Sequence, residues 1–139
     1  MPIKDIQHDI VIRSLIKAGW AIVNEQVYLS IGTSPETIRR LYVDIQAQSA
    51  TGMLVLIEVK SLSRSLIHQL MELLGQYLIY KAALTYLDIA IPLYVAIEQE
   101  DYQTLIGHVL GQKVMDEYQI PLLVYDEIAE VIQTWIPPI

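Results

Sequence analysis

The chain has 139 residues, of which 53% are hydrophobic, enough for one domain with a buried core. It contains no cysteine, which excludes disulfides, thiolate metal sites and cysteine nucleophiles. Its net charge of −7 argues against a protein that coats nucleic acid without sequence specificity. The charged residues are, however, unevenly distributed along the chain. Residues 1–81 hold eight of the nine basic residues and seven acidic ones, whereas residues 82–139 hold one basic and nine acidic residues. We therefore expect any phosphate-facing surface in the first part of the chain.

The N-terminal sequence and the apolar runs indicate where the protein resides. The opening MPIKDIQHDIVIRSL lacks the apolar core and the cleavage site of a signal peptide. The longest apolar stretches are interrupted by charges and are too short to span a bilayer. These features predict a soluble, cytoplasmic protein without a membrane partner.

The first half of the chain predicts one helix and three extended segments. Apolar spacing favours a helix over residues 5–18, with the aspartate at its start as the cap and a glycine at its end. Residues 21–31 read as extended chain. Two β-branched apolar runs around a polar turn predict a hairpin over residues 41–60, and a polar bend follows at residues 61–65.

A long helical pattern covers residues 66–87. Gly75, in its middle, costs about 1 kcal/mol relative to alanine, and such a glycine permits close packing or close approach of a ligand. Apolar and tyrosine side chains cover more of this helix than one core-facing stripe requires. We therefore expect one side of it to form a homodimer contact or a docking surface for a small partner.

The remaining elements complete an alternating pattern. Residues 89–97 predict a strand with Pro92 at its edge or start, and residues 100–110 a short helix. Residues 120–125 predict a last buried strand, and residues 126–135 a terminal amphipathic helix. The order α-β-β-β-α-β-α-β-α, without linkers or repeats, predicts a single α/β domain over residues 1–139 with a mixed sheet flanked by helices.

The hairpin carries charges in otherwise apolar strands. Asp44 lies in its first strand, and Glu58 and Lys60 lie on one face of the second. Buried charges are costly unless they are paired or bind metal, so one interpretation is a structural ion pair or an uncovered sheet face. The other is a magnesium site, in which two carboxylates hold the cation and the lysine acts on water or phosphate.

Other polar side chains have two interpretations each. Gln76 and Tyr80 share one face of the long helix, where they are either ordinary packing residues or part of a site. His8, in the first helix, is either a cap or surface residue or a metal ligand. Three arginines flank the charged strands and serve either solubility or contact with DNA: Arg39, Arg40 and Arg64.

A histidine in the first helix, an aspartate in one strand, ExK in the next and QxxxY in the following helix occur in that order. This pattern resembles the RecB-like branch of the PD-(D/E)XK nuclease superfamily, with Val43 at a variable position where the motif has proline. The resemblance implies a restriction-endonuclease-like fold and phosphodiester hydrolysis dependent on Mg²⁺ or Mn²⁺. It implies three roles: catalysis by Asp44, Glu58 and Lys60, metal binding by Asp44, Glu58 and His8, and support of the site and substrate by Gln76 and Tyr80.

Five segments also resemble the XisH family: PIKDIQHDIVIRSLIKAGW, IEVKS, ELLGQYLIYKAAL, PLYVAI and LLVYDEIAEVIQTWI. That family includes the cyanobacterial factor that controls excision of the fdxN element, so the resemblance implies a role in programmed DNA excision. It also implies DNA, a site-specific recombinase and an XisI-like factor as partners. Two functions remain open: a metal-dependent nuclease that acts in excision, and an inactive nuclease fold that serves as an adaptor for the XisI-like factor or the recombinase.

Overall fold

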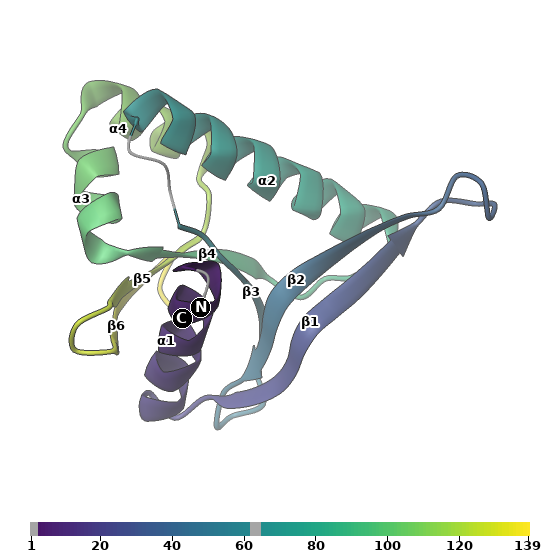
Figure 1. Ribbon diagram of the computed structural model, residues 1–139, viewed down its shortest axis with the longest axis horizontal. Coiled ribbons are helices and arrows are strands. Elements are labelled where there is room, and N and C mark those ends of the chain that lie inside the picture. The colour runs from purple at the N-terminus through teal and green to yellow at the C-terminus, as the bar shows by residue number, and fades with distance from the viewer. Residues whose placement is uncertain (1–2, 62–64) are drawn as a thin grey trace.

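The computed structural model describes the backbone of residues 3–61 and 65–139, and the side chains of residues 6–61 and 65–139. Within these ranges the helices and strands alternate along most of the chain (Figure 1). In order they are α1 (Ile3–Lys17), β1 (Ala21–Ile31), β2 (Arg39–Gln48), β3 (Leu54–Val59), α2 (Leu66–Tyr86), β4 (Leu93–Glu98), α3 (Gln99–Ile106), α4 (Val109–Tyr118), β5 (Leu122–Asp126) and β6 (Val131–Ile136).

The strands form one six-stranded sheet in the order β1-β2-β3-β4-β5-β6. The β1–β2, β2–β3 and β5–β6 pairs are antiparallel, whereas β3, β4 and β5 are parallel to one another. Figure 1 shows α1 and α2 on opposite sides of this sheet. The structure therefore confirms the predicted mixed α/β fold, with a mixed sheet flanked by helices.

The central strands bury side chains on both faces, as expected when helices cover both sides of a sheet. Val55, Ile57 and Val59 of β3 belong to the cluster that packs under α1. Leu56, between them, belongs to a cluster that includes Ala83 and Leu84 of α2. Because side chains alternate along a strand, this pattern directs the next even-numbered residue of β3, Glu58, toward the α2 side.

Several predicted elements are confirmed. The 21–31 extended segment is β1, the 66–87 helix is α2, and β4 begins directly after Pro92. The hairpin is β2 and β3, although β2 begins earlier than expected. The predicted cap at residue 5 is wrong because α1 already begins at Ile3. The predicted bend at 61–65 lies largely outside the described residues.

The predicted terminal helix at residues 126–135 is wrong, since residues 131–136 form strand β6 antiparallel to β5. The carboxylate of Asp126 accepts the backbone N–H groups of Ile128 and Ala129 at 2.8 and 3.1 Å, which stabilises a turn in place of a first helical turn. Trp135 then packs against the rings of Trp20 and Tyr94, with centroids 5.1 Å apart in both cases. Packing of this aromatic group against the α1 side favours a strand.

The segment predicted as one helix over 100–110 is two helices, α3 and α4. The ring of His108 accepts the N–H of Leu110 at 3.0 Å and caps α4, which the sequence pattern did not predict. A side chain at Gly111 would lie only 1.8 Å from the Leu105 carbonyl oxygen, so glycine lets α4 approach α3. In the part of the chain that the structure describes, no helix combines the length and apolarity needed to cross a bilayer.

The position of Ile57 gives a direct test of the two-sided core. Ile57 is fully buried, whereas Ile128 is 88% exposed. We expect Ile57→Ala to lower the free energy of unfolding by about 2–5 kcal/mol, because it removes packed methyl groups and leaves a cavity. The matched control, Ile128→Ala, should change it by less than about 0.5 kcal/mol. Chemical denaturation measures both values, and similar losses for the two variants would contradict this description of the core.

Candidate functional site

The sheet opens at the end of the β2–β3 ladder, at a point we call the fork. Pairing between β2 and β3 ends at Ile45 and Ile57. Beyond it, β2 continues with β1 as a two-stranded arm, whereas β3 continues alongside β4 (Figure 1). Val43 and Ile45 would share a face in a regular strand, but Val43 belongs to the cluster that includes residues of α2 and Ile45 to the cluster under α1, so the usual alternation of faces is lost there. The backbone of β2 therefore turns away from β3 at Asp44.

A side chain replaces the backbone partner that β3 loses at the fork. The Lys60 N–H donates to the Ala96 carbonyl of β4 at 3.0 Å, so the preceding N–H, that of Val59, points toward β2. This N–H donates to Oδ2 of Asp44 at 2.8 Å. The Asp44 side chain is 4% exposed, and a buried carboxylate is tolerated when it accepts such a bond. Asp44 thus supplies the hydrogen-bond acceptor that the Val59 N–H lacks at the end of the ladder, and its carboxylate lies beside β3.

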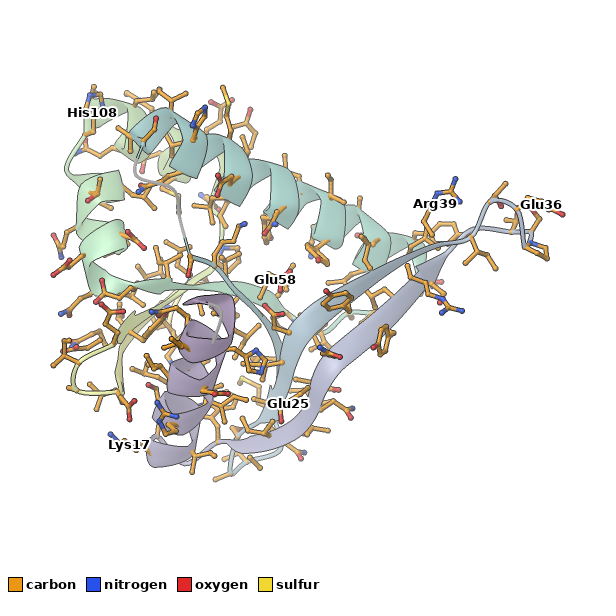
Figure 2. All side chains as sticks on the ribbon, viewed as in Figure 1. Lys17, Glu25, Glu36, Arg39, Glu58 and His108 are labelled. Atoms are coloured by element: carbon orange, nitrogen blue, oxygen red, sulfur yellow. The ribbon has the colours of Figure 1, made fainter. Side chains whose placement is uncertain are left out.

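A second carboxylate, that of Glu58, and the hydroxyl of Tyr80 lie close to Asp44. Glu58 is 6% exposed on β3, and Figure 2 shows it at the centre of the molecule, below α2. The Tyr80 hydroxyl on α2 donates to the Tyr42 carbonyl at 3.1 Å. Burial raises the pKa of Tyr80, and the neighbouring carboxylates of Glu58 and Asp44 raise it further. Tyr80 therefore remains a neutral hydrogen-bond donor, and both carboxylates lie close enough to influence it.

A cavity of about 300 Å³, which we call the β3–α2 cavity, opens above these groups. The predicted site residues that line it come from β3 and its C-terminal end (Glu58 and Lys60) and from α2 (Gln76 and Tyr80), and Arg40 of β2 also contributes. Asp44 does not line the cavity but lies behind it at the fork, next to Val59. The hairpin and the long helix thus bring most of the predicted site together.

Lys60 lines both this cavity and a second one. Its Nζ lies 3.9 Å from Oε2 of Glu72 on α2, and its side chain is 18% exposed. The sequence analysis missed Glu72, although its spacing of four and eight residues from Gln76 and Tyr80 places all three on one face of α2. The Lys60 ammonium therefore lies near Glu72 on α2, and its side chain lines the same cavity as Glu58.

The structure pairs His8 with a residue other than the predicted metal ligands. His8 Nε2 lies 2.9 Å from Oε1 of Glu25 on β1, and His8 does not line the β3–α2 cavity. Among the described side chains, no group of three His, Asp or Glu residues is arranged to hold a metal ion. The fork therefore offers two carboxylates, those of Asp44 and Glu58, without the imidazole.

The three predicted DNA-facing arginines occupy different places. Arg40 lines the β3–α2 cavity. Arg39 donates to the backbone carbonyls of Ile38 and Glu36 and lies far out on the β1–β2 arm, remote from Glu58 in Figure 2. Arg64 lies outside the described residues. Only Arg40 among the described arginines of this set is therefore part of the cavity.

The second cavity, of about 160 Å³, is acidic. Lys60 and Ser61 line its side toward the fork, and Glu98, Asp101 and Glu127 line the rest with three further polar residues. Burial raises the pKa of Asp101, and the negative charges of Glu98, Glu127 and Glu100 raise it further. The folded state therefore binds a proton at Asp101 more tightly than the unfolded chain does.

This raised pKa predicts a pH-dependent effect on stability. Above the raised pKa, Asp101 is charged in the folded protein at a cost that the unfolded chain does not bear, so its ionisation destabilises the fold as pH rises. We expect Asp101→Asn to raise the Tm at pH 7. The gain should vanish below a pH of about 4, the ordinary pKa of aspartate, where both side chains are uncharged.

The matched control is Asp116→Asn, at an exposed position of α4. Thermal melts at both pH values should show little change for this variant, because its carboxylate does not face the acidic cavity's cluster of charges. An equal gain in Tm for Asp101→Asn at neutral and at acidic pH would show that charge is not the cause.

Comparison with known proteins places the chain in a family. The family model described as XisH protein matches residues 1–133. The chain belongs to the XisH family. Two solved structures of XisH-related proteins resemble it over 95% of its length: the fdxN element excision controlling factor protein from Anabaena variabilis (32% identity, TM-score 0.81, 98% of that chain) and an XisH family protein from Nostoc punctiforme (31% identity, TM-score 0.82, 99% of that chain). A search of curated proteins finds no match for this XisH family member.

Proposed function

We propose that this XisH family protein is an accessory factor in programmed DNA excision. We further propose that its fold is restriction-endonuclease-like and that the β3–α2 cavity is a metal-dependent phosphodiesterase site. The role in excision is supported by the similar Anabaena variabilis protein, which is described as an fdxN element excision controlling factor. The observation that carries the catalytic part is a single cavity lined by Glu58, Lys60, Gln76 and Tyr80, with Asp44 at the fork behind it.

The donor set fits a hard divalent cation. Asp44 and Glu58 are both more than nine-tenths buried, and after burial itself they are causes of the raised pKa of Tyr80, so two negative charges lie near this point. Mg²⁺ or Mn²⁺ would be held by these two carboxylates and would keep several waters. When bound, the cation would supply Lewis-acid stabilisation of the phosphate and lower the pKa of water.

The other residues of the cavity would act on the substrate. The Lys60 ammonium would stabilise charge that develops on the phosphate, and Arg40 would hold a neighbouring phosphate of the strand. Gln76 and the neutral Tyr80 hydroxyl would supply hydrogen bonds on the α2 side. The basic first part of the chain would thus face the nucleic acid, while the acidic second part, residues 82–139, would face away from it.

The second candidate function is a non-catalytic adaptor that binds an XisI-like factor or the recombinase. Two contacts favour it, because they give residues of the motif structural roles. Asp44 satisfies the Val59 N–H, and Lys60 lies near Glu72. The pairing of His8 with Glu25 also leaves the two carboxylates without a histidine from the first helix.

Two substitutions test the catalytic role. Glu58→Gln keeps the size of the side chain and removes one of the few anionic ligands, so it should abolish metal binding and Mg²⁺- or Mn²⁺-dependent cleavage of DNA. Lys60→Ala should spare metal binding and slow cleavage by about 100-fold or more, the loss typical of one charge-stabilising donor. Calorimetric titration with Mn²⁺ and a cleavage assay measure the two effects.

The matched control is Glu117→Gln, at an exposed position of α4, which should bind metal and cleave DNA as the natural protein does. Melting temperatures establish that each variant is folded. Full excision activity in a stably folded Glu58→Gln protein would refute the catalytic role and support the adaptor.

A further inference from the structure

The outer side of α2 carries an uncovered apolar stripe. Its members are all exposed and fall within about 100° of the helix circumference at 3.6 residues per turn. They are Ile67, Met71, Gly75, Leu78, Ala82 and Tyr86. Two polar side chains, His68 and Thr85, share the edges of this arc, and the other exposed side chains along the described length of α2 are Ile79 and Lys81. Gln76 and Tyr80, which line the β3–α2 cavity, lie outside the stripe.

The stripe has a symmetric spacing. From Ile67 to Tyr86, successive members are separated by 4, 4, 3, 4 and 4 residues, which reads the same in both directions. A second copy of α2 that runs antiparallel therefore presents the same positions in register. In that register Met71 faces Ala82 of the other copy, and Leu78 faces Gly75. In these two central pairs a large side chain meets a small one, as interdigitated helix packing requires, whereas Ile67 and Tyr86 face each other at the ends of the stripe.

Gly75 is not explained by contacts within the chain. A Cβ built at this position meets no atom within 4 Å. Glycine is less favourable than alanine in a helix interior, so an unneeded glycine here weakens α2. On the exposed stripe it instead gives a second helix room to approach the backbone closely. In the antiparallel register, Leu78 of the other copy would lie in the open space beside Gly75.

The exposed area is sufficient for a dimer. Ile67, Met71, Leu78 and Tyr86 of the stripe, together with Ile79 at its border, are between 44% and 64% exposed. Taking about 200 Å² for a large side chain, these fractions amount to roughly 500 Å² per copy. Two copies would bury about 1,000 Å², the lower bound for a specific interface. The acidic residue of α2, Glu72, lies beside Lys60 and is not a member of the stripe, so two copies of a chain with net charge −7 meet there without a carboxylate in the stripe itself.

We infer that this stripe is a homodimer interface, in which two α2 helices pack antiparallel about a two-fold axis between Gln76 and Tyr77. The partner is a second copy of this chain, because the palindromic spacing and the pairing of large with small side chains at the centre match the stripe to itself. The β3–α2 cavity lies on the other side of α2, so dimerisation leaves it open. This inference does not depend on the proposed catalytic role.

The molecular mass in solution tests the interface. By sedimentation equilibrium on the full chain, we expect a dimer at micromolar concentration. Gly75→Gln places a long polar side chain where the copies meet, so it should weaken association by at least about 100-fold and give a monomer with an unchanged circular dichroism spectrum. Lys81→Gln, on the same helix but outside the stripe, should remain dimeric. A natural chain that stays monomeric at sub-millimolar concentration overturns the inference, as does a dimer that Gly75→Gln leaves intact.

Cross-linking tests the antiparallel register, since the chain has no cysteine of its own. The single variants Met71→Cys and Ala82→Cys are mixed and oxidised. The proposed register predicts that the disulfide between positions 71 and 82 forms in preference to either symmetric product. A predominant 71–71 product would show a parallel arrangement and overturn the proposed geometry.

Discussion

The bond from the Val59 N–H to the Asp44 carboxylate, 2.8 Å long and buried, is the contact on which the site depends. An antiparallel ladder that ends inside a protein leaves backbone groups that must find other partners. Asp44 supplies that partner from a side chain, so β2 can leave β3 without an unsatisfied N–H. The fork opens where β2 leaves β3, and residues of both strands beyond this point line the β3–α2 cavity. A backbone requirement thus positions the first carboxylate of the site.

The second constraint is the balance of charge around the fork. Asp44 and Glu58 are buried in a sheet whose neighbouring positions are apolar, and burial of a carboxylate is unfavourable without compensation. Part of the compensation comes from the Val59 N–H and from the hydroxyl of Tyr80, whose pKa is raised by burial and further by these two carboxylates. Lys60 lies near Glu72 and also borders the acidic second cavity. Under the proposed function, a divalent cation at the fork would complete this balance.

The sequence predicted those parts of the fold that depend on local patterns. The hairpin, the long helix and the strand after Pro92 follow from periodicity and turn residues over short distances. Residues 126–135 did not, because their apolar spacing suits either a helix or a strand. The choice is made by the Asp126 turn and by the packing of Trp135 against Trp20, more than a hundred residues away. Such contacts leave no local signal.

The same distinction applies to the site. ExK and QxxxY lie within single elements, so their spacing predicted which side chains share a face, and the structure places them around one cavity. The partner of His8 could not be predicted, because its pairing with Glu25 depends on how α1 lies against β1. The remoteness of Arg39 depends on the length of the β1–β2 arm (Figure 2). Glu72 was predictable from helical spacing but is not part of the motif.

The central claim is that the two carboxylates at the fork hold a divalent cation. Nuclear magnetic resonance of ¹⁵N-labelled protein titrated with Mn²⁺ tests it most directly, because the paramagnetic ion broadens the amide signals nearest to it. We predict that the amides of Val59 and Lys60 broaden first in the natural protein and remain sharp at the same Mn²⁺ concentration in Glu58→Gln. Broadening that begins elsewhere, such as at the acidic cavity of Asp101 and Glu127, or that is unchanged in Glu58→Gln, would contradict the claim.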